Sequence, residues 1–163
     1  MGAGINDGSV AKTTIEGVLL EPLAVIPAAG GPVLKMLSPK SALLPDFSGG
    51  FGEIYFSMVE KGQIKAWKRH HLQTQFFAVP VGQIKIALYD SREDSPTKGA
   101  IFETELGLPF NYGLLRIPPG IWYGFANMGE KTALICNYAD IPHDPKEGER
   151  LPLETREIPW KWE

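Results

Sequence analysis

Cysteine is nearly absent from this chain, because its 163 residues include a single one. One thiol excludes an internal disulfide framework and any zinc site built from several cysteines, and it agrees with a reducing compartment. The residue, Cys136, lies in the apolar run TALICNY, which indicates a buried strand cysteine rather than a reactive thiol. Excess positive charge is also missing, since the formal net charge is −3. Nucleic acid and anionic membranes are therefore not expected partners.

Long apolar runs are the second absence. No window holds the roughly 18 uninterrupted apolar residues of a membrane helix. The N-terminal sequence MGAGINDGSVAKTT also lacks the charged and then apolar layout of a secretory signal. We therefore expect a cytoplasmic protein.

Helical periodicity is the third absence. Eighteen glycines and fourteen prolines divide the chain into short segments, and almost no apolar pattern of helical period survives for three turns. Segments rich in β-branched and aromatic residues lie between turn residues instead, and they predict nine strands. The strands are expected at Val33–Leu37, Glu53–Val59, Gln63–Trp67, Gln75–Val81, Gln83–Tyr89, Ala100–Leu106, Gly113–Ile117, Trp122–Ala126 and Thr132–Tyr138. Short strands with tight links predict an all-β sandwich or barrel, formed as a single domain over residues 1–163.

Two segments lack a strand pattern. The first dozen residues and the stretch SPKSALLPDFSGG, residues 38–50, are rich in small and turn-forming residues. We expect both to be loosely ordered unless a partner subunit holds them.

A pair of motifs stands in GQIKAWKRHHLQTQFFAVPVG, residues 62–82, and PPGIWYGFAN, residues 118–127. Their glycine and proline spacing resembles the two motifs of the cupin superfamily, whose members are small β-barrels or jelly rolls. The ligand positions of the first motif fall on Lys68, His70 and Gln75. In the second motif the ligand position falls on Tyr123, with Asn127 four residues later. The resemblance implies a cupin-type jelly-roll barrel.

The ligand positions predict that no metal is bound there. Metal-binding cupins have His, His, Glu and His where this chain has Lys68, His70, Gln75 and Tyr123. A divalent transition metal prefers neutral imidazoles and carboxylates, which this set does not supply. The neighbouring His71 should point to the opposite face of its strand, unless a one-residue bulge exchanges the two histidines.

Four further segments are similar in order and spacing to dTDP-4-dehydrorhamnose 3,5-epimerase and its relatives, which are metal-free cupins. They are IEGVLLEPL near the start, DSREDSPTKG, LRIPPGIWYGF and RLPLETREIPW near the end. The resemblance implies an epimerase or isomerase that needs no cofactor. It would remove protons from the carbons beside the ketone of a nucleotide-linked (dTDP) 4-keto sugar and return them to the opposite face. The resemblance also implies a homodimer with exchanged N-terminal strands, with which the apolar segment VLLEPLAVI is compatible.

The resemblance assigns the positive charge and the base of the site. The diphosphate-binding arginine of the family falls on Lys65, which keeps the charge without the bidentate geometry. The base histidine falls on Lys68 in an ungapped alignment, and His70 lies two residues along on the same strand face. Either can serve, because burial in an apolar barrel lowers the pKa of a lysine. Lys68 can equally be a lysine at the rim of the barrel in contact with solvent.

The remaining assignments depart further from the family. The enolate-stabilising lysine falls on Gln75, which can donate a hydrogen bond without charge. The second-motif histidine becomes Tyr123, a phenol that can donate a hydrogen bond or act as an acid. Further candidates for substrate binding are Trp67, Arg116 and Asn127.

Two catalytic partners have no aligned equivalent. The tyrosine acid of the family falls near residues 139–143, where Pro142 takes its place and Tyr138 and His143 lie nearby. The resemblance places the carboxylate that orients the base in the C-terminal segment, where Glu154 and Glu157 are the candidates, but the interpretation we favour for both is an exposed surface carboxylate. Three hypotheses remain: a nucleotide-sugar epimerase with rearranged catalytic residues, a non-catalytic cupin that binds a nucleotide sugar or other small carbohydrate, and a structural dimer partner.

Overall fold

The structure of the protein is a computed structural model that describes residues 9–163. Residues 1–8, the larger part of the N-terminal dozen expected to be loosely ordered, lie outside the described residues. Within residues 9–163 the chain forms strands and turns and no helix. The strands are β1 Ala11–Lys12, β2 Leu19–Pro22, β3 Val25–Ile26, β4 Val33–Leu34, β5 Glu53–Val59, β6 Ile64–His70, β7 Gln75–Val81, β8 Gln83–Asp90, β9 Ile101–Gly107, β10 Gly113–Ile117, β11 Ile121–Asn127, β12 Ala133–Ala139 and β13 Gly148–Arg150.

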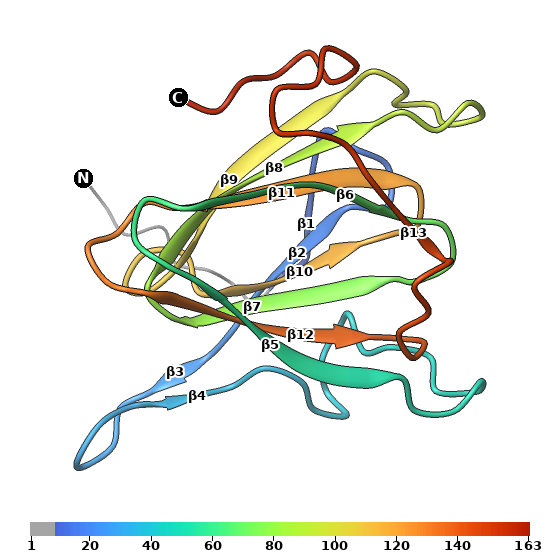
Figure 1. The fold of residues 1–163 in the computed structure, drawn as a ribbon. Helices are drawn as coiled ribbons and strands as arrows, with labels where there is room; N and C mark the ends of the chain where they lie inside the picture. The colour runs from blue at the N-terminus through green and yellow to red at the C-terminus, as the bar shows by residue number, and fades with distance from the viewer. Residues whose placement is uncertain (1–8) are drawn as a thin grey trace.

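Two antiparallel sheets face each other (Figure 1). The six-stranded sheet has the order β1-β2-β10-β7-β12-β5, and the five-stranded sheet has the order β13-β6-β11-β8-β9. The short β3–β4 hairpin extends away from both sheets. The architecture is an all-β jelly roll of the cupin type, which confirms the predicted fold class.

The strand pattern of the sequence is reproduced closely in the middle of the chain. All nine predicted segments contain a strand, and the bounds of β5, β7 and β10 agree with the prediction to the residue. The alternation in GQIKIALYD is confirmed, because Ile84, Ile86 and Leu88 are each 0% exposed. The strands β1, β2, β3 and β13 were not predicted.

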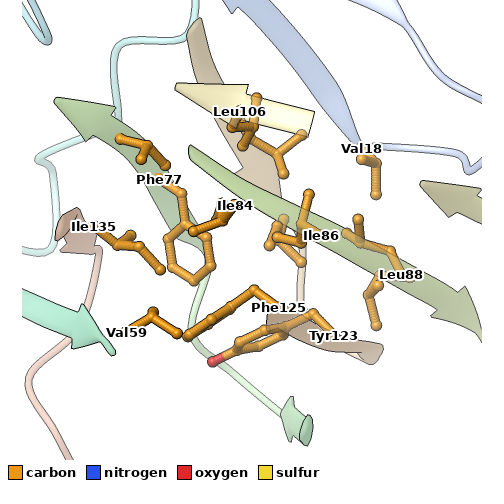
Figure 2. Packing of buried hydrophobic residues seen from close by; sticks show 14 of the residues in the cluster. Val18, Val59, Phe77, Ile84, Ile86, Leu88, Leu106, Tyr123, Phe125 and Ile135 are labelled. Atoms are coloured by element: carbon orange, nitrogen blue, oxygen red, sulfur yellow. The ribbon is translucent and has the colours of Figure 1, made fainter. Parts of the chain in front are cut away.

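The main core lies between the two sheets (Figure 2). Phe77 and Ile135 of the six-stranded sheet pack against Ile84 and Ile86 of the five-stranded sheet. Both sheets are also covered on their outer faces, one by a cluster around Tyr138 and the other by a cluster around Trp67. This double covering explains why every residue of β11 is buried.

The segment 38–50 contains turns and no strand, as its composition suggested, but it is anchored to the sheet at its middle. Leu43 is buried against the outer face of the six-stranded sheet. The carboxylate of Glu21 accepts the backbone N–H groups of Ala42 at 3.0 Å and Leu43 at 3.1 Å. Loose order therefore does not describe its central residues. Within residues 9–163, no helix long and apolar enough to cross a membrane is found.

Candidate active site

A cavity of about 240 Å³ opens between the two sheets, on the side where β5 and β13 are the edge strands. The wall from the six-stranded sheet is mostly neutral, and the wall from the five-stranded sheet carries three cationic groups. The lining residues are Tyr55, Ser57, Phe77, Ile135 and Asn137 from the first sheet, and Lys65, Ala66, Trp67, Lys68, Tyr123, Phe125 and Arg150 from the second. Phe77 and Phe125 line the cavity and also belong to the main core, where their rings pack edge to face (Figure 2).

A bulge in β6 brings two lysines to the same cavity. Tyr123 pairs with Lys68 and Phe125 pairs with Lys65, so two residues of β6 face one residue of β11. The single facing residue is Gly124, and a Cβ there would lie 2.5 Å from the Cβ of Ala66. The glycine of WYGF therefore permits the close approach that the bulge requires.

His70 is held at both ring nitrogens. Its Nδ1 lies 2.7 Å from a carboxylate oxygen of Glu147, and its Nε2 lies 3.1 Å from the hydroxyl of Tyr123. The other oxygen of Glu147 accepts the backbone N–H groups of Leu72 and Gln73, each at 2.8 Å. Because the carboxylate can only accept, Nδ1 carries the hydrogen, and a neutral His70 accepts the Tyr123 hydroxyl hydrogen at Nε2.

Burial and hydrogen bonds together set the protonation states of these three groups. Burial lowers the pKa of His70 and outweighs the hydrogen bond to Glu147, so the imidazole is neutral near pH 7. Burial raises the pKa of Tyr123 well above its usual range. Burial alone would raise the pKa of Glu147, but hydrogen bonds from His70 and from the backbone of Gln73 and Leu72 lower it below its ordinary value. The resting site is thus a neutral phenol, a neutral imidazole and a carboxylate.

A second hollow of about 310 Å³ adjoins the cavity. Lys68 and Arg150 line both spaces, and His70 and His143 line the second one. Lys68 is half-buried between the two, and its burial, followed by the nearby Arg150, lowers its pKa. With Lys65, these cations make the five-stranded wall suited to an anionic group such as a diphosphate.

Three amide side chains hydrogen-bond one another at the opposite wall, and of these Asn137 lines the cavity. Asn137 donates to the hydroxyl of Tyr55 at 2.7 Å and makes a short hydrogen bond to Gln75. Gln75 donates to the side-chain oxygen of Gln73 at 2.7 Å, and Gln73 donates to the carbonyls of Ile141 and Pro142. The three amide side chains are almost entirely buried, so their orientation is fixed by these bonds.

Known proteins are similar to this chain in sequence and in fold. The chain is 38% identical over 112 residues to the "probable low-salt glycan biosynthesis epimerase Agl13" of Haloferax volcanii, a match that covers 66% of this chain and 70% of that protein. Among solved structures, a dTDP sugar isomerase from Desulfovibrio desulfuricans G20 matches with 52% identity and a TM-score of 0.89 over 93% of this chain and 94% of that one. The chain belongs to the sugar epimerase and isomerase family.

More distant members of the epimerase family share the fold. The dTDP-4-dehydrorhamnose 3,5-epimerase of Bacillus anthracis, solved with TDP and PPi bound, is 19% identical with a TM-score of 0.80 over 94% of this chain and 89% of that one. No protein-family model matches the chain. The predicted resemblance to cupin-type nucleotide-sugar epimerases, and with it the expectation of an enzyme of this class, is confirmed.

Compared with the residues expected from this epimerase family, the structure brings four of the predicted positions together. Lys65, Lys68 and Tyr123 line the cavity, and His70 lies directly behind Tyr123. Gln75 lies on the opposite wall, behind Tyr55 and Asn137. His71 is exposed beside Glu149, 3.4 Å away, so His70 is the inward-facing histidine.

Three other predicted positions have different surroundings. The indole of Trp67 is 1% exposed and packs against Trp160 on the outer face of the five-stranded sheet, so this residue borders the cavity without presenting a free aromatic face. Arg116 lies in a separate hollow on the outer face of the six-stranded sheet. Asn127 bonds the carbonyls of Val59 and Lys131 and closes a turn. Neither Arg116 nor Asn127 lines the cavity.

Glu154 and Glu157 are both exposed, in agreement with the favoured interpretation. The carboxylate that contacts His70 is Glu147, which was not among the candidates. Glu147 precedes β13, which pairs with the end of β6, and this pairing sets it beside His70. Strand β13 has three residues and no periodic pattern, so no signal in the sequence could have identified it. Tyr138 bonds the backbone of Gly52 on the outer face of the sheet.

The metal-ligand positions of cupins do not fit a metal in this chain. The one imidazole, His70, is engaged at both nitrogens by Glu147 and Tyr123, and Gln75 is bonded within the opposite wall. Among residues 9–163, no three His, Cys, Asp or Glu side chains form a group that could hold a metal ion. The prediction of a metal-free site is tested by elemental analysis, and stoichiometric zinc, iron or manganese in the purified protein would contradict it.

Proposed function

We propose that the protein is an epimerase or isomerase of a dTDP-linked 4-keto sugar and that it needs no cofactor. The reaction begins with removal of a proton from a carbon beside the ketone. The observation that carries this proposal is the hydrogen-bonded series of Tyr123, His70 and Glu147 at the cavity wall. A neutral imidazole backed by a carboxylate is a base poised for use near pH 7.

The proton path follows from the hydrogen bonds. The C–H bond of the sugar breaks, the oxygen of Tyr123 takes that proton, and Tyr123 gives its own hydroxyl proton to Nε2 of His70. Glu147 then stabilises the imidazolium. The electron pair of the C–H bond forms an enolate, whose oxygen is stabilised by the ammonium group of Lys65 at the cavity wall.

The cations also support a nucleotide-linked substrate. Lys65, Lys68 and Arg150 offer three positive charges at the cavity, which suits the two phosphates of a dTDP group. A protein 52% identical to this one is a dTDP sugar isomerase. The substrate class therefore agrees with both the charge of the wall and the relative.

Solvent exchange tests the proposal directly. Incubated in D2O with dTDP-4-keto-6-deoxyglucose, the protein should incorporate deuterium beside the ketone, followed by NMR. His70→Gln should reduce the exchange rate by about 10²–10⁴-fold, the range expected for loss of a general base. His71→Gln, which changes the exposed neighbour, is the matched control and should exchange normally.

A binding module is the second candidate, favoured by the loss of most family catalytic positions. It predicts that dTDP raises the melting temperature while no 4-keto sugar exchanges. If neither dTDP nor a related nucleotide raises the melting temperature, the ligand class itself is wrong.

A homodimer is part of this proposal. On edge strand β5 the outward side chains Ile54, Phe56 and Met58 are 51%, 63% and 62% exposed. The projecting β3–β4 hairpin (Figure 1) exposes Val25 and Val33. An apolar edge strand of this kind is normally covered by a partner. Sedimentation equilibrium should therefore give twice the 17.9 kDa chain mass.

A further inference from the structure

We propose that Tyr55 is the second proton-carrying group of the epimerisation and acts from the wall opposite Tyr123. This inference rests on the proposed function and assigns a residue to the return of the proton. Tyr55 lies in the middle of β5 and lines the cavity, together with Ser57. No motif in the sequence singles out Tyr55.

The position of Tyr55 follows from the register of β5. Inward and outward residues alternate along the strand, and Tyr55 pairs directly with Asn137 of β12. Tyr123 belongs to β11 in the five-stranded sheet, whereas Tyr55 belongs to the six-stranded sheet. A sugar bound between the sheets therefore has one phenol on each side.

The hydrogen bonds leave the Tyr55 proton available. The amide N–H of Asn137 donates to the Tyr55 oxygen at 2.7 Å. Among residues 9–163, the acceptor recorded for the Tyr55 hydroxyl hydrogen is the side-chain oxygen of Gln75 at 3.4 Å, and that oxygen already accepts a short bond from Asn137. A bound substrate can offer a better acceptor than this long contact.

Asn137 cannot turn round to accept the proton instead. Its side-chain oxygen accepts the backbone N–H of Phe76 at 3.3 Å, and its nitrogen serves both Tyr55 and Gln75. This arrangement fixes Asn137 as a donor toward Tyr55. The phenol is thus directed to give its own hydrogen into the cavity.

The protonation state suits an acid. Burial raises the pKa of Tyr55, and this outweighs the opposing hydrogen bond from Asn137, so the phenol stays protonated at neutral pH. When the phenolate forms, the N–H of Asn137 is already in place to stabilise it.

The step balances without a further reactant. The enolate carbon takes the proton from the Tyr55 oxygen on the face opposite Tyr123, a new C–H bond forms and the ketone is restored. The Tyr55 phenolate then takes a proton from water, since its side chain is only half-buried. His70 returns its proton through Tyr123 to solvent. The configuration at that carbon is inverted.

The test separates proton removal from inversion. Tyr55→Phe and wild type are incubated in D2O with dTDP-4-keto-6-deoxyglucose, and NMR follows both deuterium uptake and the inverted product. We expect Tyr55→Phe to take up deuterium within about threefold of wild type and to lose inversion by about 10²–10⁴-fold. Tyr138→Phe removes a hydroxyl from the outer face and is the matched control, which should do both.

Other outcomes would overturn either the role of Tyr55 or the proposed function. Inverted product from Tyr55→Phe at a rate within threefold of wild type overturns the role of Tyr55 and leaves the proposed function intact. Loss of both deuterium uptake and inversion in a variant that keeps the wild-type melting temperature also overturns it. If the wild type takes up deuterium but never forms the inverted sugar, it has no second proton carrier. That result overturns the role of Tyr55 and leaves the proposed proton removal intact. If the wild type takes up no deuterium, the proposed function itself is contradicted.

Discussion

The two walls of the cavity differ in kind. The five-stranded wall is ionisable, with Lys65, Lys68 and Arg150 around a phenol, an imidazole and a carboxylate. The six-stranded wall is uncharged, and its Tyr55 and Asn137 side chains are positioned by hydrogen bonds that involve the buried Gln75. The first wall can change its protonation near neutral pH, whereas the second holds its groups in one geometry. We infer that charge and proton removal belong to one sheet, and that the opposite sheet orients the substrate and carries Tyr55, the proposed proton donor.

A single residue joins the two walls. The backbone N–H of Gln73 donates to Glu147, and its side chain accepts from Gln75. Glu147 in turn holds His70. The buried amides of the six-stranded wall therefore help, through Gln73, to position the carboxylate that orients the base.

The largest change is expected from Glu147→Gln, which would remove the carboxylate that holds His70 on the ionisable wall. The amide oxygen can still accept from Leu72 and Gln73, but its nitrogen would donate to Nδ1 of His70. That reverses the tautomer, so Nε2 carries the hydrogen and can no longer accept from Tyr123. Solvent exchange into dTDP-4-keto-6-deoxyglucose should fall by about 10²–10⁴-fold.

Glu149→Gln is the control for this change. Glu149 lies two residues along, is exposed, and pairs with Arg69 outside the cavity. Its loss should leave the exchange rate unchanged. If Glu147→Gln keeps more than a third of the wild-type exchange rate, the carboxylate does not orient the base. The ionisable groups of the five-stranded wall would then not account for proton removal.

Lys68→Met tests the charge of the ionisable wall. Losing one charged contact to a phosphate should raise KM for the dTDP sugar by about 10–100-fold, with kcat little changed. The salt dependence of KM should weaken as well. Lys98→Met, at an exposed loop position paired with Glu93, is the control. A fall in kcat at constant KM would instead make Lys68 the base, the alternative that the sequence left open.

Much of the fold was predictable because the central strands carry their own pattern. The predicted bounds hold for β5 and β7, whose segments lie between clear turn residues. The strands β1, β3 and β13 have two or three residues each, so pairing with another strand decides their existence. Pattern reading cannot detect such strands.

Only those residues of the candidate site that lie within the two spaced motifs could be predicted. Spacing identified Lys68, His70 and Tyr123, but Glu147 depends on a pairing between segments 77 residues apart. In β5 the alternation misleads, since Ile54 and Phe56 face outward. Tyr55 faces inward because the interior at this edge is a polar cavity rather than core.

The pH dependence of stability should show the smallest effect, and of the two walls only the ionisable one should contribute to it. The pKa of His70 is lowered by folding, so on acidification the unfolded chain binds that proton first. Stability is therefore fully present above about pH 6.5, the ordinary value for histidine, and is lost as the pH falls through the lower pKa of the folded state. The lowered pKa of Glu147 continues the loss at more acid pH.

Melting temperatures measured between pH 8 and pH 5 check this sign. The wild type should lose a few degrees toward pH 5, at about 2–4 °C for each kcal/mol. His70→Gln should flatten that curve, and Gln75→Leu, which changes only the neutral wall, should lower the melting temperature equally at every pH. A pH-dependent penalty for Gln75→Leu would mean that the amide wall also supports the charged state of the site, through the bonds of Gln73 to Glu147.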